Sequence, residues 1–500
     1  MQLPVTGGTR PGTRPPALIQ VVEPVDLRLP FWRYFELFRR RPYAFLLDSA
    51  KDAAGLGRFS FAGADPVAVF QAKRIRGAAS RAARIRITRS PRLVGERVSE
   101  FVADPLAELR LLLAELAPAA AASAAGPLPF GAGAVGYFGY EAGHFVEDLP
   151  DAGSDDLGLP DVQFGLFDLV LGHDHASSES YASVIARGPR AAEERLAVCR
   201  YALREFERAA APSEVLPAGD PAALEVAAHF DRDGYARAVE ACRRHIYRGD
   251  AFEICLTHRL QTPFAGDTWR LYGALRSISP APFAAYLELP GVQVLSSSPE
   301  RFVRVSANGL VESRPIKGTR PRGATAEADA ALHDELAGSA KDRAENMMIV
   351  DLVRNDLGRV CEIGSVEVSE LMAVERYATL FQMVSTVRGR LEADRDALDL
   401  VRAAFPGGSM TGAPKIEAMK IIDRLEPVKR GIYSGSIGYL DVSGAADLNI
   451  VIRTLVVKDG QCFYNVGGAI VADSDPYSEY DETMDKAYAL ELALAAAAGR

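Results

Sequence analysis

The sequence has few cysteines, and their spacing excludes a zinc finger or a disulfide framework. The five are Cys199, Cys242, Cys255, Cys361 and Cys462, with no Cys-x-x-Cys pair among them. The segment before Ser49 also lacks the charged-then-apolar pattern of a secretory signal. Both absences favour a reducing cytoplasm as the location of the protein.

Long apolar runs and an excess of positive charge are absent as well. No apolar run approaches the ~20 residues that a membrane-spanning helix needs, so we expect no membrane association. Lys and Arg number 57 against 66 Asp and Glu, a net charge of −9, which argues against general nucleic-acid binding. With 48% hydrophobic and 25% charged residues, the chain has the composition of a soluble globular protein. The expected partners are small molecules or proteins.

Shifts in composition predict two regions and a tail. Residues 1–17 are rich in Pro, Gly and Arg and predict a flexible tail. A stretch rich in Ala, Pro and acidic residues, 209–227, separates a front region from a motif-dense back region. We therefore expect an N-terminal region over 18–226 and a C-terminal region over 227–500.

Hydrophobic periodicity in the back region predicts both helices and strands. A helical stripe runs through 231–250, and residues 251–260 alternate as in a strand. Further strands are expected at 283–289, 292–296, 302–305 and 310–314, and helices near 325–357, 413–426 and 477–498. The short separations between strands suit antiparallel pairing. The predicted class is α+β, with antiparallel sheets and flanking helices.

Polar residues stand in the back region where a fold alone would not require them. SSSPERF (296–302) places Glu300 at the end of a predicted strand, and SRPIKGTRPRG (313–323) places Lys317 before Gly318 and Thr319. A lysine in such a loop is ordinarily solvated. The neighbouring Gly and Thr favour the alternative, because their donors can approach an anionic ligand closely.

Two predicted helices carry acidic residues on one face. Glu345 lies on the first, and Glu479, Glu482 and Lys486 recur along the second. Ion pairs within a helix and the helix dipole explain such residues without any function. The alternative is that both helices converge on Mg²⁺, which prefers hard oxygen ligands. Glycine-rich turns at 405–415 and 465–476, the latter with Gly467 and Gly468, would suit a carboxylate.

Seven motifs taken in order resemble the chorismate-utilising enzymes over residues 228–490. They are SSSPERF, RPIKGTRPRG, AENMMIVDLVRNDLG, FPGGSMTGAPK, RGIYSGSIGYLD, ADLNIVIRTL and VGGAIVADSDPYSEYDET. In the front region FLLDSA, GRFSFAGADP and GAVGYFGYE are similar to the anthranilate and aminodeoxychorismate synthases rather than to the shorter isochorismate-type members. The resemblance implies the family's fold, in which large antiparallel sheets pack together.

Individual residues distinguish the branches of this family. The isochorismate and salicylate synthases carry a water-activating lysine where Glu253 stands in this chain, and anthranilate synthases carry Ala where Lys317 stands. The chain therefore resembles the large subunit (component I) of the aminodeoxychorismate synthases. The resemblance implies amination of chorismate at C4 with ammonia, giving 4-amino-4-deoxychorismate for para-aminobenzoate and folate synthesis. The alternatives are an anthranilate synthase component I and a non-catalytic chorismate-fold binding protein.

The resemblance also assigns roles to residues. Lys317 would add at C2 of chorismate as a neutral amine, favoured by desolvation or by the positive charge of Arg314 and Arg320. Glu300 would transfer protons, and Gln382, where many relatives have His, could only position a group. Glu345 and Glu482, with Glu479 and Asp342 as lesser candidates, would hold Mg²⁺. The substrate would contact Tyr433, Arg453, Gly318, Thr319, Gly467, Gly468, Gln382 and Lys486.

Two further expectations concern other ligands. No glutaminase-like Gly-x-Cys-x-Gly turn occurs in the sequence, so ammonia is expected from a separate glutamine amidotransferase subunit. Ser49, Pro282, Phe283 and Ala284 occupy positions that bind tryptophan in relatives. Asp48 departs from the Leu-Leu-Glu-Ser pattern of the feedback-inhibited type, which weighs against inhibition by tryptophan.

Overall fold

The structure is a computed structural model that describes residues 17–50, 56–77, 81–92, 97–118, 126–211, 219–377 and 380–499. Apart from Ala17, the predicted flexible tail lies outside the described residues, as do residues 212–218 of the predicted inter-region stretch.

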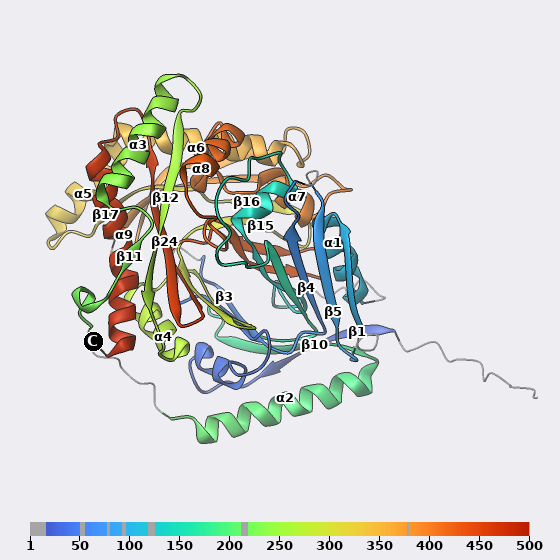
Figure 1. Ribbon diagram of the computed structural model, residues 1–500. Coiled ribbons are helices and arrows are strands. Elements are labelled where there is room, and N and C mark those ends of the chain that lie inside the picture. Colours follow the sequence, from blue (N-terminus) through green and yellow to red (C-terminus); the bar gives the residue numbers. More distant parts are fainter. Residues whose placement is uncertain are drawn as a thin grey trace, which may run out of the picture.

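Two antiparallel sheets of twelve strands each dominate the described part of the chain (Figure 1). The first sheet has the order β1 (Leu18–Val25), β10 (Glu179–Arg187), β9 (Leu169–Asp174), β3 (Phe59–Gly63), β2 (Phe45–Asp48), β13 (Phe283–Leu289), β14 (Val292–Ser298), β23 (Thr454–Lys458), β24 (Gln461–Ile470), β12 (Glu253–Pro263) and β11 (Ala227–Ala228), and β20 (Gly412–Ala413) also pairs with β12. The second has the order β17 (Ile316–Pro321), β19 (Leu380–Arg390), β16 (Leu310–Ser313), β15 (Arg301–Val305), β22 (Ala446–Asn449), β21 (Ser436–Asp441), β7 (Gly133–Phe138), β8 (Val162–Phe167), β4 (Ala68–Arg74), β5 (Ala83–Arg89) and β6 (Arg97–Ala103), with β18 (Glu367–Arg376) on β19. The predicted α+β class with large antiparallel sheets is confirmed.

Both sheets take strands from both predicted regions. In the first sheet β2 pairs with β13, and in the second β7 pairs with β21. The division near residue 226 is therefore not a boundary between separate sheets, and as a functional division it stays a prediction. The core between the sheets joins the two regions too, because Phe45 and Val135 of the front pack in one cluster with Val294 and Ile437 of the back.

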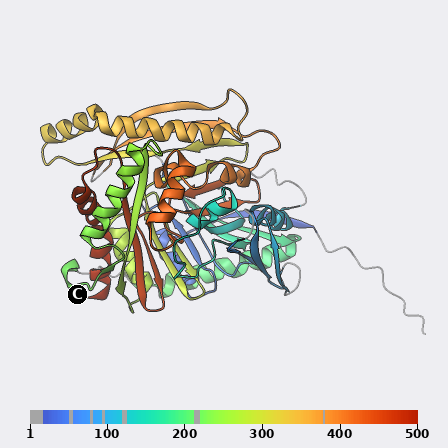
Figure 2. The same cartoon turned by 45° about the horizontal axis from the view of Figure 1, so that its top comes forward.

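Helices cover the outer faces of the sheets. The α-helices are α1 (Pro105–Leu116), α2 (Pro189–Ala209), α3 (Arg232–Tyr247), α4 (Thr268–Ile278), α5 (Ala326–Gly338), α6 (Ala340–Gly358), α7 (Ala397–Ala404), α8 (Lys415–Leu425) and α9 (Pro476–Ala498), and the 3₁₀ helices are η1 (Phe31–Leu37), η2 (Tyr140–Phe145), η3 (Pro221–Ala223) and η4 (Gly408–Met410). Helices α3, α4 and α9 pack on the first sheet. In Figure 2 helix α6 extends beside the long strands of the second sheet, which it contacts at β17 and β19. None of the described helices combines the length and the apolar character needed to cross a bilayer.

The predicted elements of the back region are largely confirmed. Helix α3 buries Tyr235, Val239 and Cys242 as the periodicity predicted, and strand β13 has the predicted bounds. The helical pattern near 325–357 is instead two helices, α5 and α6. They separate at Ser339, whose side chain accepts a hydrogen bond from the Asp342 amide and so caps the start of α6.

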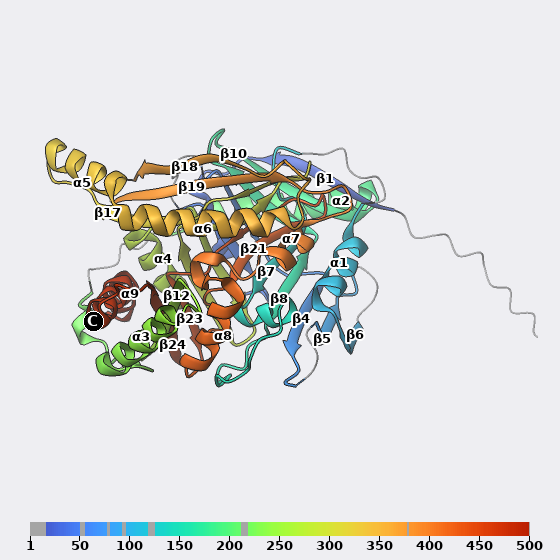
Figure 3. The same ribbon diagram turned by 90° about the horizontal axis from the view of Figure 1, so that it is seen from above.

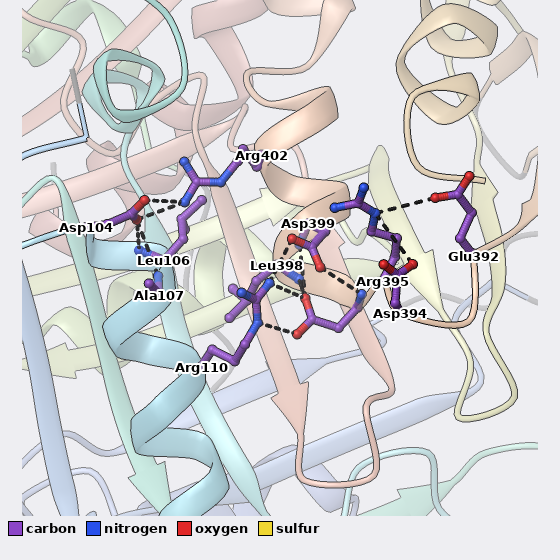
Figure 4. A network of polar contacts seen from close by, with 11 residues as sticks. Asp104, Leu106, Ala107, Arg110, Glu392, Asp394, Arg395, Leu398, Asp399 and Arg402 are labelled. Atoms are coloured by element: carbon purple, nitrogen blue, oxygen red, sulfur yellow. Dashed lines mark hydrogen bonds and ion pairs between the residues drawn. The ribbon is translucent and has the colours of Figure 1, made fainter. Parts of the chain in front are cut away.

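Ion pairs between helices fix α7, which lies in the back half of the chain, against α1 of the front half (Figure 4). Arg402 donates to both carboxylate oxygens of Asp104, the N-cap residue of α1, at 2.8 and 2.6 Å. Arg110 donates to both oxygens of Asp396, the N-cap residue of α7, at 2.6 and 2.9 Å. Each helix start is thus satisfied by its own aspartate, which also receives an arginine from the other helix.

Candidate active site

A cavity of about 590 Å³ lies where α6 and α9 meet the ends of β12, β17 and β24 (Figure 3 shows these elements together). Every residue that the sequence proposed for catalysis, substrate binding and metal binding lines it: Lys317, Glu300, Gly318, Thr319, Tyr433, Arg453, Gly467, Gly468, Gln382, Lys486, Glu345, Glu482 and Glu479. The structure therefore brings them to one place. Their individual roles stay predictions.

Lys317 lies inside the cavity against a buried carboxylate. Its Nζ donates a hydrogen bond to Oε1 of Glu253 at 2.9 Å and lies 3.9 Å from Oε2 of Glu345. Glu253 is fully buried at the start of β12, and its Oε2 atom has no hydrogen-bond partner among the described residues. The alternation of β12 places Glu253 on the face that looks into the cavity, together with Cys255 two residues later.

The surroundings of Lys317 differ from those expected. Burial lowers its pKa, but the charges of Glu253 and Glu345 and the Glu253 hydrogen bond outweigh burial, so the pKa lies above its ordinary value. Arg314 is paired with Glu375 instead, and Arg320 with Asp342 and Glu335. The expectation that these two arginines would favour the neutral amine is wrong, because carboxylates already neutralise them.

Glu300 has the protonation behaviour of an acid–base group. Its side chain is buried, and burial raises its pKa to about 7, while hydrogen bonds from Ser409 and Ile316 and the charge of Lys317 act in the opposite direction. A carboxyl group with a pKa near neutrality can both donate and accept protons at physiological pH. Its backbone oxygen accepts a hydrogen bond from the Ile450 amide at 3.0 Å, which fixes the chain at this point.

Strands β17 and β19 shape one wall of the cavity. Thr319 lies opposite Gln382 in their pairing, after an irregularity in β17. Gly318 in this irregularity has a φ of 83°, and a Cβ there would lie 2.9 Å from the carboxyl carbon of Asp342. A side chain at this position would therefore clash with α6. Gln382 is buried, and its amide can hydrogen-bond but cannot transfer a proton at ordinary pH.

Arg453 and Tyr433 leave polar groups unpaired in the cavity. Within the described ranges, neither the Arg453 guanidinium nor the Tyr433 hydroxyl has a hydrogen bond or an ion pair. Burial lowers the pKa of Arg453 from its ordinary value, yet an arginine keeps its charge. A partly buried guanidinium without a partner suits an anion, and a carboxylate can accept two of its hydrogen bonds at once.

The acidic residues form the opposite side of the cavity. Glu482 pairs with Nζ of Lys486 at 2.7 Å, and Glu479 accepts a hydrogen bond from Ser474 at 2.7 Å. Glu345 lies between two lysines, 3.9 Å from Nζ of Lys317 and of Lys341. Each glutamate thus has a lysine or a hydroxyl as its partner.

The glutamates suit a hard cation by their chemistry. As placed, no three acidic, histidine or cysteine side chains of the described residues lie close enough to share one ion. The carboxylates of Glu345, Glu479 and Glu482 nevertheless all face the cavity, and a Cβ at Gly468 would lie only 3.0 Å from Oε2 of Glu479. Glycine at this position leaves open the space beside the carboxylates. Their oxygen donors are of the type that Mg²⁺ prefers, and a cation would take over the neutralising role of the lysines.

Several cavity residues were missed by the sequence reasoning. Lys341 lies one helical turn before Glu345, a spacing that could have drawn attention to it. Ser409 belongs to the FPGGSMTGAPK motif, which supplied a glycine-rich turn and part of the family resemblance but no role for this serine. Asn465 directly precedes the glycine pair of β24 and had no signal of its own. Glu253 was considered only as the replacement of a lysine, although it is the closest charged group to Lys317.

The residues proposed for tryptophan line a different cavity, of about 320 Å³. These are Ser49, Pro282, Phe283 and Ala284. Oδ2 of Asp48 accepts hydrogen bonds from the Tyr272 hydroxyl at 3.0 Å and from Arg276 at 2.6 Å. Asp48 is therefore already paired within the protein, and tryptophan binding stays a prediction.

Comparison with known proteins gives consistent similarities. Residues 71–491 match the family model described as chorismate binding enzyme. The chain is 45% identical to an aminodeoxychorismate synthase of Streptomyces pristinaespiralis over 92% of its own length, but it spans only 62% of that relative. It is 38% identical to aminodeoxychorismate synthase component 1 of Salmonella typhimurium, covering 94% of this chain and 98% of that one.

A solved structure shows the same arrangement. Anthranilate synthase component I from Streptococcus pneumoniae TIGR4 superposes with a TM-score of 0.72 at 31% identity, over 87% of this chain and 92% of that one. Its two-sheet architecture therefore resembles the one described above.

Proposed function

Because the chain belongs to the family of chorismate binding enzymes, we propose that it aminates chorismate at C4 with ammonia. The product is 4-amino-4-deoxychorismate, the precursor of para-aminobenzoate in folate synthesis. The observation that carries the proposal is Lys317, held by Glu253 in the cavity that also contains the unpaired Arg453. Relatives named aminodeoxychorismate synthase, 45% and 38% identical to the chain, support the same activity.

The two sides of the cavity suit the two carboxylates of chorismate. Arg453, together with the Tyr433 hydroxyl of the same cavity, binds one carboxylate through hydrogen bonds. The other carboxylate faces the acidic side, where Glu345 and Glu482, with Glu479, would hold Mg²⁺. When bound, this cation neutralises the carboxylate and orients the ring. Chorismate then lies between Arg453 and the acidic helices, over Lys317.

Lys317 supplies the nucleophile. Its proton passes to Glu253, its hydrogen-bond partner at 2.9 Å, and the free amine forms a bond to C2 of chorismate. The electron pair moves through the conjugated double bonds of the ring and expels the C4 hydroxyl, which takes a proton from Glu300 and leaves as water. Ammonia then adds at C4, the electrons return, the C2–N bond breaks, and Glu300 accepts the proton that the new ammonium loses.

Glu300 carries the proton transfers because Gln382 cannot. The pKa of about 7 at Glu300 allows one group to serve as acid and then as base. Gln382 is left with a positioning role. The first alternative, anthranilate synthase, is favoured by the similarity to the pneumococcal structure and to relatives named anthranilate synthase component 1, 40% and 38% identical to the chain, but it gives no role to a lysine at position 317. The second, a non-catalytic binding protein, gives no role to Glu300 and Lys317 together.

The ammonia is proposed to come from a separate glutamine amidotransferase subunit. The Salmonella relative is named component 1, which implies a further component in that enzyme. The 500 residues of this chain contain no glutaminase-like Gly-x-Cys-x-Gly turn. Neither observation identifies the partner. Ammonium salts supply ammonia directly, so the isolated chain should work with them.

Identification of the product tests the proposal. The purified chain is incubated with chorismate, MgCl₂ and an ammonium salt, and the products are separated and identified by mass spectrometry. We expect 4-amino-4-deoxychorismate without stoichiometric pyruvate. Anthranilate and pyruvate in equal amounts would identify an anthranilate synthase, and unchanged chorismate would identify a binding protein.

A further inference from the structure

Arg430 is a fully buried arginine that the catalytic proposal does not use. Its side chain is 1% exposed and lies between the end of α8 and the inner face of β12. The guanidinium lies over the Tyr140 ring, with 4.5 Å between its central carbon and the ring centroid. The Glu141 carboxylate accepts hydrogen bonds from the backbone amides of Arg430 and Gly431, both at 2.9 Å. Backbone and side chain are thus both fixed.

All five N–H donors of Arg430 are used. Glu426 accepts from Nε at 2.8 Å and from Nη2 at 2.6 Å. The backbone oxygen of Met410 accepts from Nη1 at 2.7 Å, the Ser434 hydroxyl from Nη1 at 3.2 Å, and the backbone oxygen of Cys255 from Nη2 at 2.7 Å. The Glu426 carboxylate also accepts from the Thr257 amide at 2.8 Å. A guanidinium has five donors in a rigid plane, and here each has a partner.

Three of these partners belong to segments that line the candidate active site. Cys255 of β12 and Met410 of η4 line the cavity themselves, and Ser434 directly follows the cavity residue Tyr433. Met410 follows Ser409, which hydrogen-bonds to Glu300, and Cys255 lies two residues after Glu253. The Arg430 guanidinium therefore joins three segments. They carry Glu253, the partner of Lys317; Ser409, the partner of Glu300; and Tyr433, a proposed ligand of the substrate carboxylate.

We propose that Arg430 is a positioning residue for the amination reaction. It touches no substrate. It holds β12, η4 and the Tyr433 turn at fixed mutual distances, and so sets the place of chorismate relative to Lys317. The inference rests on the proposed function, because it concerns the same cavity. Glu426 neutralises the buried charge of Arg430. It also adds a second link to β12, because its carboxylate accepts the hydrogen bond from Thr257.

Lysine cannot replace this arginine. Its ammonium group keeps the charge next to Glu426, but it has three donors at one point instead of five in a plane. A lysine at 430 can donate to Glu426 and to one further acceptor, so the other segments lose their hydrogen bonds to this residue. The segments that line the cavity can then shift, while the ion pair with Glu426 persists.

The test compares Arg430→Lys with Arg195→Lys. Arg195 on α2 makes a bidentate pair with Asp168, with one contact at 2.9 Å, and it is not among the residues that line the active-site cavity. For both variants and the wild type we would measure chorismate affinity by calorimetry, kcat and KM for chorismate with ammonium salt, and Tm. Ser434→Ala, which removes a single contact, is the second probe and does not depend on whether Arg430→Lys folds.

Arg430→Lys is expected to raise KM for chorismate roughly 10-fold and to lower kcat on the order of 10²-fold, since a misplacement of about 1 Å costs that much. Ser434→Ala is expected to shift KM in the same direction by a smaller factor, while Arg195→Lys changes only Tm. Equal kinetic losses in Arg430→Lys and Arg195→Lys, or a loss of active protein at unchanged KM in both Arg430→Lys and Ser434→Ala, would overturn the inference. A wild type that binds chorismate without aminating it refutes the proposed function, and the affinity measurements still decide whether Arg430 positions the ligand.

Discussion

Replacing Lys317 by Met tests the catalytic lysine and the buried ion pair together. Met keeps most of the aliphatic stem and removes only the amine, so the variant leaves little additional cavity. We expect it to form no 4-amino-4-deoxychorismate, because the bond at C2 needs the amine of Lys317. The other two lysines of the cavity lie beside Glu345 and Glu482 instead. It also leaves Glu253, which is fully buried, without its cationic partner.

The structure gives the magnitude of the second effect. Removing one partner of a buried ion pair costs about 3–5 kcal/mol, because the remaining charge has lost its compensation. Oε2 of Glu253 already lacks a partner among the described residues, and in the variant Oε1 loses its hydrogen bond from Lys317. The variant should therefore unfold at a Tm several degrees lower. A catalytic loss alone would not change Tm.

A double variant separates the two effects. Adding Glu253→Leu to Lys317→Met removes the stranded carboxylate and should restore most of the free energy of unfolding, since apolar replacement of a buried pair is often neutral. Activity should stay absent in the double variant. The assays are thermal unfolding, product analysis, and mass spectrometry of the Lys317 peptide after trapping during turnover. Product formation by Lys317→Met would refute the role of Lys317 as the nucleophile. A Tm equal to that of the wild type would refute the contribution of the buried Lys317–Glu253 pair to stability.

Three further predictions concern the same cavity. Glu345→Gln and Glu482→Gln should fold normally but lose turnover at ordinary MgCl₂, because each removes one ligand of a hard cation; near wild-type rates in both would disprove the metal assignment. If Glu300 donates the proton to the leaving hydroxyl, kcat should fall as pH rises through about 7, and a pH–rate profile of Glu300→Gln should lack this limb. The isolated chain should use ammonium salts but not glutamine, and glutamine-dependent turnover without a partner would contradict the separate subunit.

Local patterns in the sequence predict local structure well in this protein. The stripe of 231–250 corresponds to α3, which buries one face. The alternation of 251–260 corresponds to β12, although consecutive residues of this strand are buried, so both of its faces are covered. The separation of α5 from α6 was missed, although Ser339 followed three residues later by Asp342 is typical of a helix start. The helical periodicity continues across this point, so periodicity alone could not reveal it.

The sequence also predicted which residues share a cavity, but not how they are paired. The motifs that resemble the family lie together in the structure, from Glu300 to Lys486. Charge pairing is set by tertiary contacts, and the partners lie far apart in sequence: Lys317 and Glu253 are 64 residues apart, and Arg314 and Glu375 are 61 apart. No periodicity spans such separations. The interleaving of front and back strands is hidden for the same reason.

The pairing of Lys317 changes the account of how its amine becomes reactive. The sequence predicted a neutral amine at Lys317, favoured by desolvation or by neighbouring positive charge. The structure shows a buried carboxylate, which favours the ammonium form of Lys317. A proton transferred from Lys317 to Glu253 leaves two neutral groups and creates no isolated charge in a buried place, where an unpaired charge is costly. The amine is then generated by transfer within the pair at the moment of attack, rather than kept free beforehand.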